Sequence, residues 1–180
     1  MIQTYSGELF NPLAADGEDC GPIRLFDIAH ALSNLCRFNG HVKRFYSVGE
    51  HSLYVSALLD SSKYGNSREL QRWGLMHDAA EAYLGDMVRP IKQKMPEFEA
   101  IEDRLLRRIA GRFGLVWPIP PEVFDADEIM LATEFRDLKH SMPKTPLKMP
   151  PSSLVIPLRR EPSESVRDRF LRTADNLGLK

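Results

Sequence analysis

The sequence has few cysteines, no long apolar run and no basic leader. Only Cys20 and Cys36 occur among 180 residues, and neither belongs to a CxxC or CxxH pair. This argues against a thiolate zinc site, and we expect two free thiols in a reducing cytoplasm. No stretch approaches 18 consecutive apolar residues, which argues against a membrane span. The opening MIQTYSGELF lacks the basic start and apolar run of a secretory signal.

A strong net charge is also missing. Lys and Arg number 24 and Asp and Glu number 25, which leaves a formal net charge of -1 at pH 7. There is no overall basic field to attract nucleic acid or a membrane surface, although a local basic pocket stays open. Apolar residues make up 43% and charged residues 27% of the chain, as in ordinary soluble proteins. A chain of this length can form one domain, residues 1–180, with a core that needs no disulfides.

Hydrophobic periodicity predicts an all-α fold: a bundle of about six helices with a short N-terminal β-hairpin around Ser6–Gly7. Ser47 followed by Glu50 is a capping-box pattern, and Gly85 is expected to end a helix. Residues 141–162 contain six prolines and are expected to form a long irregular loop. The expected helices cover residues 27–38, 47–59, 68–84, 96–113, 121–138 and 163–176.

Polar residues of the kind that bind metals fall on the inner faces of three of these helices. They are His51, the pair His77–Asp78, and Asp127. Taken singly, a buried histidine is commonly a hydrogen-bonded core residue and an aspartate a cap or an ion-pair partner. Together they would need several separate partners, whereas one divalent cation satisfies all four. Imidazole with carboxylate favours Mn²⁺, Fe²⁺, Co²⁺ or Zn²⁺ over Ca²⁺ or Mg²⁺.

The motifs that carry these residues resemble those of the HD-domain metal-dependent phosphohydrolases. GEHS, HDAAEAYLGD and DADEIMLATE carry the resemblance, which covers about residues 27–140. It is closest to the bacterial 5′-deoxynucleotidase branch, and phage dNTP triphosphohydrolases are built similarly. The resemblance implies an HD-domain helical bundle, a homodimer, and one divalent metal ion bound by His51, His77, Asp78 and Asp127.

Two acidic residues near these ligands have roles implied by the same resemblance. Glu81 matches a catalytic glutamate, and its position four residues after His77 independently places it one turn along the same helix face. It would hold or activate the attacking water, or alternatively orient a ligand histidine from outside the metal's coordination sphere. Asp86 matches an aspartate that contacts the sugar hydroxyl, or it caps the next turn.

Basic and aromatic residues complete the implied substrate site. Arg37 and Phe38 match an arginine–aromatic pair in which arginine grips phosphate oxygens and the ring contacts the sugar or base. Phe38 stands where the relatives carry tryptophan. Lys92 follows the GD element much as a lysine does in the relatives, and the resemblance implies that it is a second candidate for binding phosphate. Glu134 and Asp137, by contrast, are expected to face solvent or to bind neighbours such as Arg136.

The expected function is hydrolysis of a deoxynucleoside 5′-monophosphate to deoxynucleoside and phosphate. One alternative is a dNTP triphosphohydrolase that releases triphosphate, and another is hydrolysis of an alarmone or cyclic nucleotide. A non-catalytic nucleotide sensor is an alternative of a different class. The balanced charge disfavours a nucleic-acid-binding module.

Overall fold

The computed structural model describes the backbone of residues 1–180 and every side chain except that of Ser62. A two-stranded antiparallel hairpin, β1 (Ile2–Gln3) and β2 (Leu9–Phe10), precedes a set of helices. The expected all-α bundle with a short N-terminal hairpin is therefore confirmed. The helices are α1 (Leu25–Asn34), η1 (Arg37–Gly40), α2 (Val48–Leu59), η2 (Ser62–Tyr64), α3 (Arg68–Met76), α4 (Glu81–Leu84), α5 (Arg89–Lys92), α6 (Pro96–Phe113), α7 (Pro121–Leu138) and α8 (Ser163–Asn176).

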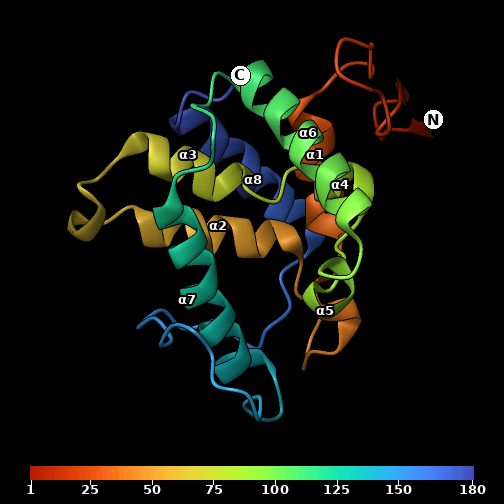
Figure 1. Cartoon of the computed structure of the whole chain (residues 1–180). Coiled ribbons are helices and arrows are strands. Elements are labelled where there is room, and N and C mark those ends of the chain that lie inside the picture. The colour runs from red at the N-terminus through yellow and green to blue at the C-terminus, as the bar shows by residue number, and fades with distance from the viewer.

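Helix α2 lies at the centre of the bundle and contacts α1, α3, α7 and α8 (Figure 1). Its start is fixed by the capping box that the sequence predicts: the Ser47 hydroxyl accepts from the Glu50 amide, and the Glu50 carboxylate accepts from the Ser47 amide. The core around α2 contains large side chains that are fully buried, among them Trp73, Tyr46 and Phe170. The N-terminal half of α2 is thus held rigidly in the core.

The expected helix over residues 68–84 is interrupted in the structure. Helix α3 ends at Met76, and α4 begins only at Glu81. Between them the amides of Ala79 and Glu81 donate to the carbonyls of Met76 and Asp78, three residues back. This tighter 3₁₀ winding turns successive side chains by more than an α-helix does, and such segments often mark functional positions. Gly85, with φ of 84°, ends α4 as predicted.

The first expected helix, over residues 27–38, also ends early. Helix α1 stops at Asn34, because the next residues pair with the chain before α2. The Val48 amide donates to the Leu35 carbonyl and the Arg37 amide to the Tyr46 carbonyl, around an antiparallel bridge between Cys36 and Ser47. This backbone pairing replaces the last helical turn and places Arg37 in the separate turn η1.

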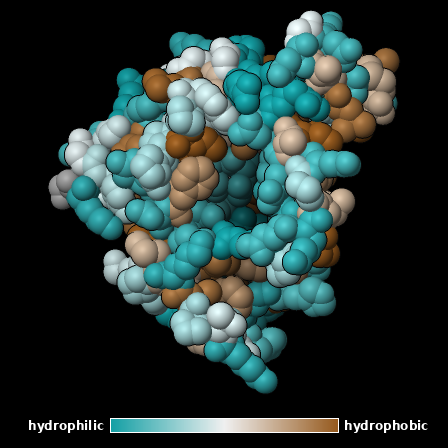
Figure 2. Space-filling model, viewed as in Figure 1, coloured by the Kyte–Doolittle hydropathy of each residue, from teal (hydrophilic) through white to brown (hydrophobic). Residues whose placement is uncertain are grey.

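Residues 139–162 form the irregular segment that the prolines predict. It runs beside the last turns of α7, where the Ser152 amide donates to the Thr133 hydroxyl and the Ile156 amide to the Asp137 carboxylate. Figure 2 shows that one face of the molecule is hollowed near its centre and that hydrophilic residues form much of the rim, with hydrophobic residues at its left edge. Among the described helices, none has the length and apolar character needed to cross a membrane.

Candidate metal centre and adjoining cavity

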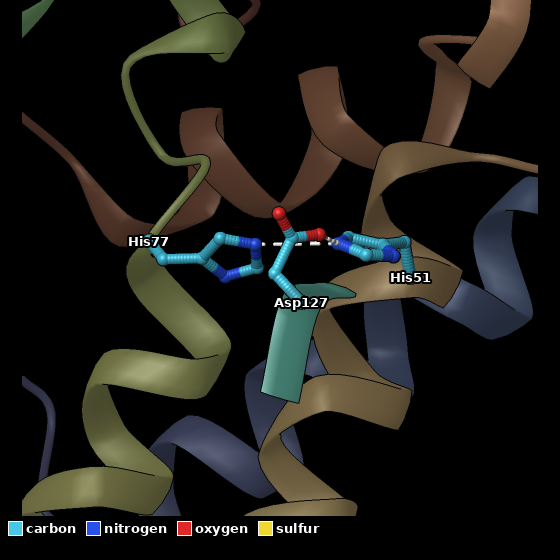
Figure 3. Close-up of side chains that lie close together, drawn as sticks. All are labelled: His51, His77 and Asp127. Atoms are coloured by element: carbon cyan, nitrogen blue, oxygen red, sulfur yellow. Dashed lines mark hydrogen bonds and ion pairs between the residues drawn. The ribbon is translucent and has the colours of Figure 1, made fainter. Parts of the chain in front are cut away.

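Three of the four predicted ligands converge in space from three helical segments. His51 comes from α2, His77 follows the last residue of α3, and Asp127 comes from α7, and their side chains point toward one another (Figure 3). The Nε2 atoms of the two histidines are 3.2 Å apart, and His51 Nε2 is 3.1 Å from Asp127 Oδ1. This group can hold a metal ion.

The fourth predicted ligand, Asp78, lies at the same point. Its Oδ2 atom is 3.3 Å from His77 Nε2 and 3.6 Å from His51 Nε2. Ligands bound at the usual metal–nitrogen and metal–oxygen distances are separated from their neighbours by about 3 to 3.5 Å. Asp78 Oδ2 is therefore near both histidines of the His51, His77 and Asp127 group that could hold a metal ion, and a donor set of imidazoles and carboxylates suits a transition metal.

In each histidine, the ring nitrogen Nδ1, which faces away from the cluster, is hydrogen-bonded to another residue. His51 Nδ1 lies 2.7 Å from Glu134 Oε1, and His77 Nδ1 lies 2.9 Å from the Gly74 carbonyl oxygen. Both partners accept, so Nδ1 carries the proton in each neutral ring and Nε2 presents a lone pair to the cluster. Two lone pairs facing each other at 3.2 Å beside carboxylates repel one another unless a positive charge lies between them.

The expectation that Glu134 faces solvent is wrong. Its side chain is completely buried, and its two oxygens contact His51 and Arg37. Glu134 lies seven residues after Asp127, which is two turns along the same face of α7. That spacing is the signal by which the sequence could have placed it beside the metal ligands. Asp137 does bind Arg136, as expected.

Arg37 lies at the boundary between the cluster and the cavity described below. Its guanidinium contacts Asp78 Oδ2 at 3.4 Å and Glu134 Oε2 at 3.3 Å, with the side chain only 12% exposed. Burial opposes its positive charge, but Glu134 and Asp78 outweigh that effect and raise the pKa of the guanidinium above its usual value. Arg37 therefore bridges Asp78 and Glu134, the carboxylate that is hydrogen-bonded to His51.

The shifted pKa values of His51 and Asp127 show that the cluster stabilises a positive charge. Burial and Arg37 disfavour a protonated His51, yet Glu134 and Asp127 prevail and raise the pKa of His51 to about 9. Burial likewise opposes the charge on Asp127, but the hydrogen bond to His51 lowers the pKa of Asp127 to about 2. Without an ion, a proton on His51 supplies the positive charge at the centre.

Glu81 is buried beside the cluster and is not hydrogen-bonded to His51 or His77. Its Oε2 atom is buried and has no hydrogen-bond partner among the described residues. Burial, followed by repulsion from Asp78 and Asp86, raises the pKa of Glu81 well above its usual range. Since Gly74 occupies His77 Nδ1 and Glu134 occupies His51 Nδ1, Glu81 does not orient a ligand histidine. An unpartnered buried carboxyl beside a donor set for a cation fits a group that contacts metal-associated water.

A cavity of about 450 Å³ opens from the cluster. This volume is in the range of small-molecule sites, roughly 300 to 1,000 Å³. Every residue that the sequence analysis assigned to catalysis or substrate binding lines it, together with Asp78 and Asp127. The full lining is Arg37, Phe38, His41, Asp78, Glu81, Asp86, Met87, Val88, Arg89, Pro90, Lys92, Asp127, Leu131, Phe135 and Lys139.

The predicted substrate residues have protein partners in the cavity wall. Lys92 forms an ion pair with Glu102 of α6. Asp86 follows Gly85 and does not cap the next helix, because α5 has Val88 at its N-cap and no side-chain cap. The Phe38 ring packs edge-on against Phe135, with centroids 6.0 Å apart. Sequence reasoning missed Arg89, which reaches Asp127 Oδ2 at 3.4 Å, and Lys139.

A close approach of two helices positions His77. A β-carbon built on Gly74 would lie 2.8 Å from Leu59 Cδ1 and 2.9 Å from Ser56 Cα, so only glycine allows α3 to pack this tightly on α2. The Gly74 carbonyl is also the acceptor for His77 Nδ1. One glycine thus fixes both the helix spacing and the ring orientation of a ligand.

Comparison with known proteins gives two relatives. The chain is 39% identical over 138 residues to the uncharacterized protein YfdR of Escherichia coli (strain K12), covering 77% of this chain and 72% of YfdR. It is 36% identical over 126 residues to the uncharacterized protein RCAP_rcc00048 of Rhodobacter capsulatus, covering 68% of this chain and 61% of that protein. The chain thus spans less than two thirds of the length of the second relative. No family model matches the chain.

Proposed function

The chain belongs to the family of the Escherichia coli protein YfdR, and we propose that it is a metal-dependent phosphohydrolase of the HD-domain type that acts on nucleotides. One observation carries the proposal: the His51, His77 and Asp127 group, which could hold a metal ion, adjoins through Asp127 and Asp78 a small-molecule cavity that four cationic side chains line. The substrate proposed is a deoxynucleoside 5′-monophosphate, and the products are deoxynucleoside and phosphate.

The charge of the cavity supports a phosphate ligand. Four cationic side chains and four carboxylates line it, so the protein alone is close to neutral there; they are Arg37, Arg89, Lys92, Lys139, Asp78, Glu81, Asp86 and Asp127. One divalent ion adds two positive charges. A phosphate monoester carries about −1.5 to −2 charges at pH 7, so it would neutralise this excess.

The side chains of the site would have separate roles in hydrolysis. A divalent ion held by His51, His77, Asp78 and Asp127 would supply Lewis-acid polarisation of phosphate and an activated water. Glu81 would position that water, because it is the buried carboxyl without another partner. The raised pKa of Glu81 would be lowered by the positive charge of a bound ion, and the ionised carboxylate would then accept the proton of the water.

Phosphate charge would be met by the cations beside the cluster. Arg37 and Arg89 are both close to the cluster, since Arg37 contacts Asp78 and Arg89 contacts Asp127. Because Arg37 already binds the carboxylates of Asp78 and Glu134, we assign it two roles: it holds the site together and it binds the phosphate.

A second cavity favours a monophosphate over a triphosphate. It has a volume of about 500 Å³, and Arg89, Lys92 and Asp127 line both cavities. Its lining includes three cations, all paired with carboxylates, and four carboxylates: Arg89, Lys92, Lys148, Glu99, Asp125, Asp127 and Glu128. A triphosphate tail that extended there would meet excess negative charge. We therefore place dNTP triphosphohydrolase activity second.

The test is a panel of deoxynucleoside mono- and triphosphates with Mn²⁺, Co²⁺, Zn²⁺ and Mg²⁺, with phosphate, pyrophosphate and triphosphate measured separately. We expect phosphate from monophosphates with a transition metal, and no turnover by His77→Gln, which lacks one ligand. Triphosphate release would select the second activity. A metal-loaded protein that binds nucleotides without turnover with any metal would overturn the proposal in favour of a nucleotide sensor. Cytoplasmic location and a homodimer remain part of the proposal.

A further inference from the structure

Three residues of α7 and the C-cap residue that follows it form a stripe that lines the cavity beside the metal-ligand cluster. Asp127, Leu131, Phe135 and Lys139 follow one another at intervals of four residues, and all four line that cavity. At 1.5 Å per residue the stripe is about 18 Å long from the first α-carbon to the last. It leads from a metal-ligand carboxylate past two apolar side chains to an ammonium group.

Lys139 differs from the other cations of this cavity. Arg37, Arg89 and Lys92 are each paired with a carboxylate. Within the described part of the chain, Lys139 forms no ion pair: its ammonium donates to the His41 carbonyl. An ammonium has three donors, so two remain for a ligand.

Lys139 belongs to an aromatic corner at the far end of the stripe. Its Nζ atom lies 4.1 Å from the centroid of the Phe38 ring and 5.7 Å from that of Phe135. Such cation–aromatic contacts attract the ammonium to the faces of the rings. The corner therefore offers apolar ring surface together with directed hydrogen-bond donors.

The backbone holds this corner in a strained conformation. Phe38 and Asn39 have φ of 56° and 50°, in the left-handed region, which asparagine tolerates but a bulky residue such as phenylalanine rarely adopts. The Lys43 amide donates to the Leu138 carbonyl and so ties this turn to the end of α7. Strain of this kind is typical of ligand clamps.

We propose that Phe38, Phe135 and Lys139 form the base-binding end of the cavity and that Lys139 selects among bases by donating a hydrogen bond to a carbonyl oxygen. This inference rests on the proposed nucleotide substrate. Guanine offers the acceptors O6 and N7, whereas adenine has an amino group in place of O6. An ammonium cannot accept from that amino group, so the corner favours guanine over adenine. The phosphate would lie at the opposite end of the stripe, beside Asp127.

The test compares dGMP with dAMP, which match in size and charge. The metal-loaded wild type should prefer dGMP in kcat/KM by about tenfold or more, the usual discrimination of a well-formed base contact. Lys139→Met should reduce the preference to within about twofold. The amide of Lys139→Gln can also accept a hydrogen bond, so this variant should shift the preference toward dAMP. Lys139→Gln also serves as the second variant if Lys139→Met fails to fold. Lys63→Met is the matched control, because Lys63 also stacks on a ring, that of Tyr64, but does not line the cavity.

Binding of deoxyguanosine and deoxyadenosine, measured by calorimetry, separates this inference from the proposed function. These nucleosides carry no phosphate, so a preference for deoxyguanosine that Lys139→Met removes would support the corner even if no nucleotide were hydrolysed. Hydrolysis without base preference would overturn the inference alone. An equal loss of kcat/KM for dGMP and dAMP in Lys139→Met would also overturn the inference, because it would mean that Lys139 binds the phosphate or stabilises the fold.

Discussion

Glu134 joins the metal-ligand cluster to a buried ion pair, so its replacement should have two separable effects. Its Oε1 atom accepts from His51 Nδ1, and its Oε2 atom contacts Arg37. Glu134→Gln preserves the shape of the side chain and removes its charge. Arg37 then keeps only Asp78 as a carboxylate partner.

The effect on stability follows from the buried charge. Removing one partner of a buried ion pair costs about 3 to 5 kcal/mol, and we expect about 3 kcal/mol because Asp78 still contacts Arg37. The double variant Arg37→Met/Glu134→Gln has no stranded cation and should recover most of this loss. Urea unfolding in chelator, which excludes metal from the comparison, measures both values.

The effect on the metal has another cause. A carboxylate that accepts from the outer nitrogen of a ligand histidine raises its basicity, and loss of such a partner costs roughly 10- to 100-fold in metal affinity. Calorimetric titration with Zn²⁺ or Mn²⁺ should show this loss in Glu134→Gln. The double variant should show it too, because replacing Arg37 does not restore the carboxylate.

Glu50→Gln is the matched control. Glu50 precedes His51 on α2, is buried, and is paired with Arg44, but within the described residues its side chain bonds to Arg44 and Ser47 and not to His51, His77 or an aspartate of the cluster. It should lower stability and leave metal affinity unchanged. Unchanged metal affinity in Glu134→Gln would refute the role of Glu134. Recovery of metal affinity in the double variant would show that Glu134 acts only through Arg37.

Three further predictions concern the same site. Glu81→Gln should keep the metal and lower kcat by roughly 10²- to 10⁴-fold; normal turnover in single-turnover assays of the metal-loaded variant would remove Glu81 from the mechanism. Gly74→Ala should lower the free energy of unfolding in urea by roughly 1 to 3 kcal/mol, because the new β-carbon would meet Leu59 and Ser56. It should also weaken metal binding by displacing His77. Wild-type stability together with wild-type metal affinity would contradict the close-packing argument.

The pKa of His51 is raised from 6.5 to about 9 in the folded chain, so its protonation stabilises the metal-free fold fully below pH 6.5, and that contribution is lost as the pH rises toward 9. In chelator, the Tm of the wild type should fall as the pH rises from 6.5 to 9, and the Tm of His51→Gln should fall less. Parallel pH profiles of Tm in the two proteins would contradict the role of His51 protonation.

Local sequence signals were sufficient for most helix boundaries. Helices α6, α7 and α8 match the expected ranges 96–113, 121–138 and 163–176, because prolines and glycines flank them and their apolar residues repeat with helical spacing. The same periodicity put His51, His77 and Asp127 on inner faces, and the structure brings these three together. A buried polar stripe is a local property, which is why the sequence alone revealed it.

Only the tertiary structure decided how the ligands are supported. His51 and Glu134 are 83 positions apart in the chain, and Arg37 meets Glu134 only because the turn η1 packs against α7. The break between α3 and α4 and the early end of α1 likewise depend on contacts outside the helix concerned. Helical periodicity assigns a side chain to a face, but its partner on another helix depends on how the helices pack, and that packing determined which charges in this site are paired.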